Sequence, residues 1–262
     1  MIIEDNRIIM LFKFGEQRWM EKLVEGNISF SCAGNFIHQA LKTGNVVQGD
    51  PYEGVFARLK NSDPLIHDMI KKLGDDLELI DDHPYVLLRR KSSKLKPIFC
   101  LYGYKNTDAL KECIGPKEGK NSIKHLFHDE MYSGFSNSLT AYNVIADSHR
   151  FAQVSFTKSN SFITRIKLAL AVKGIGYKMD NVNYTEFEQD TFFIPPTQSY
   201  DELFYKFPRY QHQHECRICL KSMTFSNIYK RYNLEIGRLP NDEYEITNFP
   251  FYITTEVILK KV

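Results

Sequence analysis

Residues Phe204 to Leu220, FYKFPRYQHQHECRICL, constrain the fold of this chain more than any other stretch. From Gln211 onward the residues predict a β-strand, in which successive side chains point to opposite faces. One predicted face becomes increasingly apolar and fits a core, whereas the other carries amide, carboxylate and guanidinium groups. This polar row is compatible with two interpretations, a lined cleft and a solvated outer face. The first face consists of His212, His214, Cys216, Ile218 and Leu220, and the second of Gln211, Gln213, Glu215, Arg217 and Cys219.

The composition is that of a globular protein with a sizeable core. The 262 residues are 43% hydrophobic and 25% charged, and the 19 Phe and 15 Tyr favour a strand-rich interior. No βαβ alternation and no internal repeat is evident, so we expect a single α+β domain over residues 1–262. The formal charge of +2 neither requires nor excludes a nucleic-acid partner.

The ends and the cysteines of the sequence favour a cytoplasmic protein. The first residues include two acids where a secretory signal would be basic, and no run of eighteen apolar residues could span a membrane. The five cysteines are odd in number and lack framework spacing, which predicts reduced thiols. Cys216 and Cys219 have CxxC spacing, but on a strand they face opposite ways, so we expect no metal site.

The periodicity of the chain predicts its helices and strands. Helices are expected over residues 16–25, 36–41, 63–74, 107–115 and 162–173, and Ser199 with Glu202 has the spacing of a capping box. Strands are expected over residues 8–14, 27–31, 77–80, 85–90, 97–104, 141–146, 151–156, 177–187, 229–238, 244–247 and 252–259.

Two polar segments leave alternatives open. Arg89 to Lys96 holds five basic residues in eight, which fits either a phosphate-binding segment or a solvated edge with protective charges. In the segment Gln48 to Gly54, Asp50 and Glu53 bracket a Pro-Tyr turn, which is either a plain turn or part of a site. No Rossmann, P-loop, GxSxG or HExxH motif is present.

Several pieces of the sequence together resemble a bacterial and phage family known only as a domain of unknown function. These pieces are FKF around Lys13, the segments Gly26 to Ser31 (GNISFS) and Gly49 to Gly54 (GDPYEG), and the late segment Tyr210 to Ile218 (YQHQHECRI). They are similar to the family's YKY strand, FS strand, NDP[FY]E turn and E-x-R-[IL] strand. Residues 97–104 resemble the middle strand, and a Trp-x-x-Tyr motif is degraded at residues 131–135.

This layout is also similar to mono-ADP-ribosyltransferases of the Q-x-E type, which implies a split, strand-rich sheet with flanking helices and NAD as substrate. The resemblance places Gln213 and Glu215 as catalytic residues, and Lys13, Ser29, Ser31, Tyr52 and Arg217 as NAD-binding residues. Glu215 would stabilise an oxocarbenium-like state and hold the ribose, and Gln213 would orient the acceptor. Ser31 would hydrogen-bond Glu215, Lys13 would hold a phosphate or ribose, and Tyr52 would stack on nicotinamide.

The expected function is therefore ADP-ribosyl transfer from NAD by a toxin or defence effector, to a protein or nucleic-acid acceptor and with a possible antitoxin or immunity protein as partner. The alternatives are a non-catalytic nucleotide- or nucleic-acid-binding module of the same fold and a phage interaction protein. As a cleft carboxylate, Glu215 is expected to contribute little to packing, so that Glu215→Ala would abolish activity and leave the fold intact.

Overall fold

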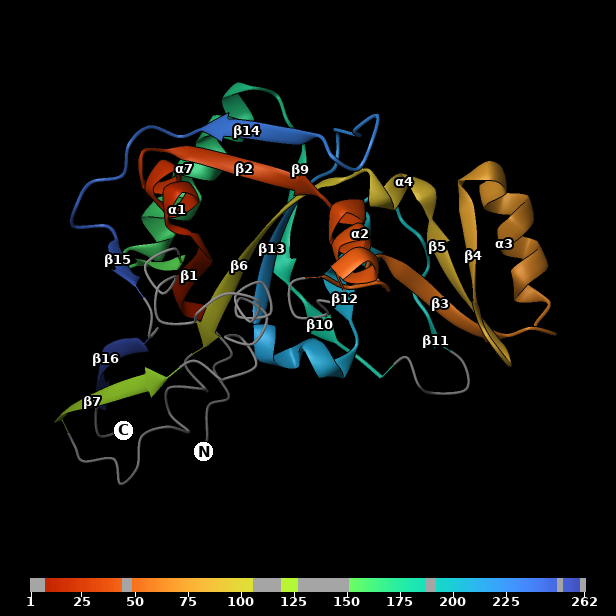
Figure 1. Ribbon diagram of the computed structural model, residues 1–262, viewed down its shortest axis with the longest axis horizontal. Helices are drawn as coiled ribbons and strands as arrows, with labels where there is room; N and C mark the ends of the chain where they lie inside the picture. The colour runs from red at the N-terminus through yellow and green to blue at the C-terminus, as the bar shows by residue number, and fades with distance from the viewer. Residues whose placement is uncertain are drawn as a thin grey trace. The chain divides into compact units, whose positions relative to one another are not determined.

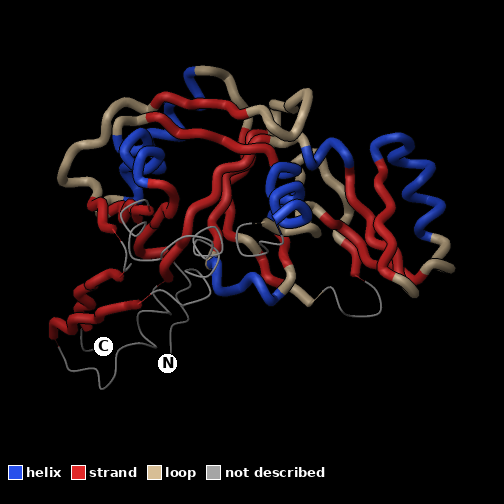
Figure 2. Tube along the Cα trace, in the orientation of Figure 1, coloured by secondary structure: helices blue, strands red, loops and turns tan. Residues whose placement is uncertain are grey.

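The computed structural model describes residues 8–43, 49–105, 119–126, 151–186, 192–248 and 252–259. The chain divides into two compact units, each assembled from separate stretches of sequence. Unit 1 comprises Met1–Ile28, Leu101–Lys167 and Glu235–Val262, and unit 2 comprises Ser29–Cys100 and Leu168–Leu234. Strand-rich, largely antiparallel sheets with a few helices make up the described parts, as expected for an α+β protein (Figure 2). The assignment of residues 1–262 to a single domain stays a prediction.

Unit 1 is organised around strand β1 (Ile8–Glu16), which pairs antiparallel with the end of β6 (Pro97–Lys105) and with β8 (Phe151–Phe156). Strand β15 (Glu245–Asn248) continues this sheet beside β8, and β7 (Gly119–Leu126) pairs with β16 (Tyr252–Leu259). Helix α7 (Ser159–Val172) begins in unit 1, where the Phe156 and Phe162 rings stack at 3.8 Å.

Helix α1 (Gln17–Val24) follows β1 and buries Met20, Leu23 and Val24, as the periodicity predicts. Trp19, expected on the same face, is 47% exposed, and the Arg18 guanidinium and the Lys22 ammonium each lie 4.9 Å from its ring centre. The helix ends at a turn in which Gly26 has φ +98°, and a Cβ at this position would stand 2.3 Å from the Gly237 carbonyl oxygen. Only glycine fits there.

Unit 2 contains two larger sheets. In the first, β2 (Asn27–Cys32) pairs with the beginning of β6 and with β14 (Arg231–Glu235), and β13 (Glu215–Leu220) pairs with β6 and β9 (Tyr177–Asn181) (Figure 1). Helix α2 (Ala33–Thr43) follows β2 directly and is longer than the helical turn expected from the sequence. A short parallel pair joins β10 (Asn183–Tyr184) to β12 (Tyr205–Lys206).

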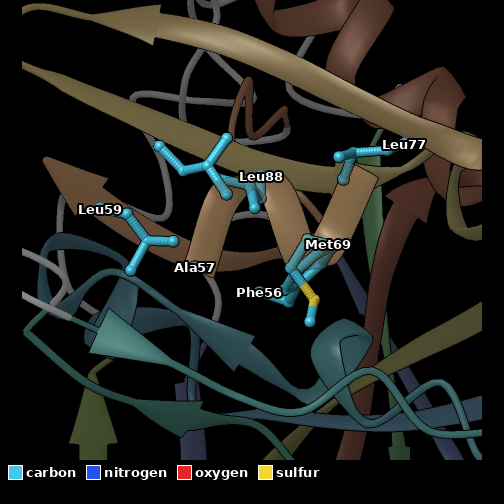
Figure 3. Close-up of a cluster of buried hydrophobic side chains, with 7 residues drawn as sticks. Phe56, Ala57, Leu59, Met69, Leu77 and Leu88 are labelled. Carbon is cyan, nitrogen blue, oxygen red and sulfur yellow. The ribbon is translucent and has the colours of Figure 1, made fainter. Parts of the chain in front are cut away.

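The second sheet of unit 2 has the strand order β11–β3–β5–β4. Its strands are β3 (Val55–Lys60), β4 (Leu77–Asp82), β5 (Tyr85–Arg90) and β11 (Phe192–Phe193), and the sequence periodicity did not predict β3 or β11. Helix α3 (Leu65–Leu73) packs against it through Ile66 and Met69, and Leu59, Leu77 and Leu88 lie in the same buried cluster (Figure 3). The backbone N–H of Leu65 donates to Asp63 Oδ1 at 2.9 Å, so Asp63 caps the helix as predicted.

Short helical segments complete the unit, namely η1 (Gly74–Asp76), α4 (Lys91–Lys94), η3 (Asp201–Phe204) and η4 (Pro208–Gln213). The predicted capping box at Ser199 is wrong, because Tyr200 with φ 55° precedes η3 and the Glu202 carboxylate points to Arg90 and Ser93 instead. The predicted helix over 107–115, the strand over 141–146 and the degraded motif at 131–135 lie outside the described residues.

Candidate functional site

The segment before β13 is not the strand that its alternation predicts. Residues 208–213 form η4, which Pro208 begins, and His214 turns the chain with φ 40° before β13 starts at Glu215. All six residues of β13 are buried. The face that carries Glu215 and Arg217 is therefore neither a solvated face nor an open cleft wall, since both side chains lie inside unit 2.

Arg217 is at the centre of this interior and is 1% exposed. Its Nε donates to Glu215 Oε1 at 2.7 Å, while Nη1 and Nη2 reach the two carboxylate oxygens of Glu53 at 2.5 and 3.2 Å. Nη1 also donates to the Leu203 carbonyl oxygen. The planar guanidinium matches the two oxygens of the Glu53 carboxylate, and bidentate pairing of this kind compensates the charge of an arginine in a core.

Lys206, from β12, supplies the second cation. Its Nζ donates to Glu215 Oε2 at 2.7 Å and to Gln213 Oε1 at 2.9 Å, and lies 3.8 Å from Glu53 Oε2. Both oxygens of Glu215 thus accept from cations, and its backbone N–H donates to the Tyr184 hydroxyl at 2.9 Å. We call Glu53, Lys206, Glu215 and Arg217 the buried ion network.

The charges within this network decide the protonation of its members. Burial acts to raise the pKa of Glu215, but the Arg217 and Lys206 charges and the Arg217 hydrogen bond outweigh it, so this pKa lies far below its usual value. Burial likewise acts to lower the pKa of Lys206, yet Glu215 and Glu53 hold it above its ordinary range. Both side chains are therefore charged at neutral pH.

The turn at residues 49–54 belongs to the same interior. Glu53 joins Arg217, and Asp50 is 2% exposed and accepts from the backbone N–H of Tyr52 at 2.8 Å. Burial first, and then the charge of Glu53, raise the pKa of Asp50 to about 6. Arg89 Nη1 donates to the carbonyl oxygens of Pro51 and Glu53, at 3.0 and 3.3 Å. The acids of this turn are thus internal groups.

The basic segment Arg89 to Lys96 is also largely internal, so both interpretations of it from the sequence are wrong. Arg89 pairs with Glu78 at 2.9 Å, and Arg90 donates through Nε to the buried Glu202 at 2.7 Å. Lys96 donates to the carbonyl oxygens of Lys221 and Met223 and to the Thr224 hydroxyl. These three cations are buried and stabilise contacts within unit 2.

Some of the site residues predicted from the sequence meet at the buried ion network, and others lie elsewhere. Gln213, Glu215 and Arg217 meet through Lys206 and Glu53, and Tyr52 lies on the adjoining turn. Ser31 accepts from the Asn35 side chain at 3.4 Å, and its expected donation to Glu215, whose oxygens accept from Arg217 and Lys206 in the described chain, stays a prediction. Ser29 is half-buried on β2, and Lys13 belongs to β1 of unit 1, where it pairs with Val154.

Sequence reasoning missed Lys206 and Glu202. Lys206 sits between aromatic residues in the stretch YKF, and Glu202 had been given to a helix cap. The only signal available was that each is a charged residue directly next to large apolar or aromatic residues, and this signal does not name a partner.

Comparison with known proteins gives no relative, since no family model, no curated protein and no solved structure matches the chain. Across the described ranges, no helix is long and apolar enough to cross a membrane. The same ranges hold no cluster of three or more His, Cys, Asp or Glu side chains arranged to bind a metal ion. The described cysteines, Cys32, Cys100, Cys216 and Cys219, are free thiols, and Cys113 lies outside the described residues.

Proposed function

We propose that unit 2 is a nucleotide-binding module, with NAD as the first ligand to test. The observation that supports this proposal is that the two motifs of the family resemblance meet in one place. Glu53 of the D-P-Y-E turn and Arg217 of the E-x-R strand, 164 residues apart, join in the buried ion network. The pair fixes the turn that presents Tyr52, the residue expected to stack on a ring.

Binding without turnover fits the surroundings of Glu215 better than catalysis does. Its side chain is 6% exposed, and its two oxygens accept from Arg217 and Lys206. A carboxylate that stabilises an oxocarbenium-like state must face the ribose. In this arrangement the negative charge of Glu215 is already compensated by the protein.

ADP-ribosyl transfer from NAD is the second candidate, and one observation favours it. Gln213 and Glu215, the Q-x-E pair, accept from the same Lys206 ammonium, which holds the amide and the carboxylate close together. Movement of Lys206 away from this pair would expose one oxygen of Glu215. In that case the protein would be an ADP-ribosyltransferase-like enzyme, of the toxin or defence type, with a protein or nucleic-acid acceptor.

The test separates the two candidates. Purified protein is titrated with NAD by calorimetry, and the same preparation is incubated with labelled NAD and a cell lysate while nicotinamide release and label transfer are followed. Binding without release supports the module, whereas transfer that is lost in Gln213→Ala supports the enzyme. Gln213 is half-buried and outside β13, so its truncation spares the strand. Absence of NAD binding and of release contradicts both candidates.

A further inference from the structure

One cluster on unit 2 combines a cation with several aromatic rings, and we call it the stacking cluster. Arg209 of η4 is exposed, and its Cζ lies 5.2 Å from the ring centre of Tyr52, 5.0 Å from that of Phe207 and 5.3 Å from that of Tyr210. The Tyr52 and Phe207 rings are 5.0 Å apart and tilted by 55°. Both rings are half-buried, whereas Tyr210 is buried.

Arg209 differs from the other arginines of this region in its partners. Arg89, Arg90 and Arg217 are each paired with a carboxylate. Within the described chain no carboxylate forms an ion pair with Arg209. An exposed guanidinium that rests on aromatic faces retains donors for an external anion, and its plane can stack on a ring.

The rings of the stacking cluster stand on a rigid base. The Tyr52 backbone donates to Asp50 at 2.8 Å and accepts from the Val55 N–H at 3.0 Å, and Arg89 holds the carbonyl of Pro51. On the other side, the Phe207 carbonyl accepts from the Tyr210 N–H at 3.0 Å. A backbone fixed in this way at the base of the rings loses little further freedom when a ligand binds, which favours binding.

We propose that Arg209, Tyr52 and Phe207 form a stacking site for the planar ring of a nucleotide, with the Arg209 guanidinium placed to contact its phosphate. The inference rests on the proposed nucleotide binding and names the ring as the part recognised. Stacking tolerates different bases, because every base has a π-face, whereas a guanidinium matches phosphate geometry. The ligand class is therefore a nucleotide that carries both groups.

Calorimetry with AMP and ribose 5-phosphate tests this site, because the two ligands share the phosphate and differ in the base. We expect AMP to bind at least about tenfold more tightly than ribose 5-phosphate. Arg209→Ala and Phe207→Leu should each weaken AMP binding about tenfold or more, and Arg209→Lys should restore only part of it. Arg231→Ala is the matched control, since Arg231 is an exposed arginine on β14, and it should bind AMP like the wild type. Circular dichroism verifies that each variant is folded.

The outcomes distinguish the stacking site from the proposed function. If the wild type binds AMP and both Arg209→Ala and Phe207→Leu bind it equally well, the stacking site is overturned and nucleotide binding stands. If Phe207→Leu weakens the binding of AMP and of ribose 5-phosphate by the same factor, ring recognition is overturned and only the phosphate contact of Arg209 remains. If the wild type binds neither AMP nor NAD, the proposed function fails and the stacking site fails with it.

Discussion

Asp50 carries the least favourable charge in the interior of unit 2. Three carboxylates, those of Asp50, Glu53 and Glu215, face two cations, those of Lys206 and Arg217, so the group has an excess of one negative charge. One proton removes this excess. Asp50 takes it most readily because the two glutamates hold the short ion pairs with Arg217, whereas among the described residues the Asp50 carboxylate accepts from the backbone N–H of Tyr52 alone.

The first prediction concerns the pH dependence of this charge. The folded pKa of Asp50, about 6, is raised from 3.8, so its protonated form stabilises the fold below pH 4 and this contribution is lost as pH rises through 6. Asp50→Asn, which keeps an oxygen for the Tyr52 N–H, should therefore be more stable than the wild type at pH 7.5, by at most about 3 kcal/mol. At pH 4 the two proteins should be similar. Urea unfolding at both pH values measures the difference, and Asp63→Asn, at the cap of α3, serves as the control.

The second prediction reverses the expectation that Glu215 contributes little to packing. Glu215→Ala removes the carboxylate that accepts from Arg217 Nε and Lys206 Nζ and leaves these buried charged donors without that partner, which should cost about 3–5 kcal/mol of unfolding free energy. Glu186→Ala removes an exposed carboxylate of the same unit and should change the unfolding free energy by less than about 0.5 kcal/mol. Equal urea midpoints for the two variants would show that Glu215 is not a structural ion-pair partner. The pKa of Glu215 is lowered, so its contribution is present at neutral pH and is lost on acidification below about pH 4.5.

At the scale of elements, the packing of the turn at residues 49–54 on α2 gives the third prediction. A Cβ added at Gly49 would stand 2.5 Å from the Ala40 nitrogen and 2.6 Å from the Phe36 carbonyl oxygen, and these backbone atoms of a helix cannot move aside cheaply. Gly49→Ala should therefore cost about 1–3 kcal/mol of unfolding free energy. Gly176→Ala is the control, since its nearest neighbours are Ser222 side-chain atoms at 3.7 Å. Chemical denaturation of both variants measures the costs, and a neutral Gly49→Ala would contradict this packing.

Elements with strong local signals could be predicted from the sequence. Strand β1, helix α1, helix α3 and strand β5 were expected close to their observed bounds, because their apolar periodicity and their caps are local properties. The start of β13 was not predictable in the same way. Alternation over QHQHE fits a strand, but Pro208 begins a helical turn that extends to Gln213, and Lys206 donates to both Gln213 and Glu215 in this arrangement.

The burial of the candidate site could not be predicted from the sequence either, because it depends on contacts between residues that are far apart in the chain. The sequence singled out Asp50, Glu53, Glu215 and Arg217 as unusual polar residues, and the structure brings them together. The sequence did not indicate that these four side chains are buried, because an alternating row of polar residues has the same appearance on a solvated face and in an internal ion network. Burial depends on partners from elsewhere in the chain, such as Lys206, which pairs with Glu215, and Arg217, which pairs with Glu53.

At the scale of the whole molecule, unit 2 depends on the meeting of two distant stretches. Glu53 with Arg217, and Arg90 with Glu202, both join residues 29–100 to residues 168–234, across sequence separations of 164 and 112. The buried Glu53 and Arg90 thus find their charged partners in the other stretch, although Arg89 with Glu78 and Lys206 with Glu215 pair within one stretch. Such non-local contacts form only after the cost of closing a long loop has been met, so unit 2 should behave as one cooperative structure.

The fourth prediction uses hydrogen exchange to test this cooperativity. Glu202→Gln weakens the pairing of the buried Arg90, so the amides of β5 and β13 should lose protection together, although they belong to different sheets of unit 2. The amides of β1 and β8, in unit 1, should keep their protection. Strand β6 is divided between the units after Cys100, and its first half should follow β13 while its second half follows β1. Asp242→Asn breaks the exposed pair with Lys158 and should alter exchange in none of these strands. An equal loss of protection in β1 and β13 on Glu202→Gln would mean that the chain unfolds as one unit.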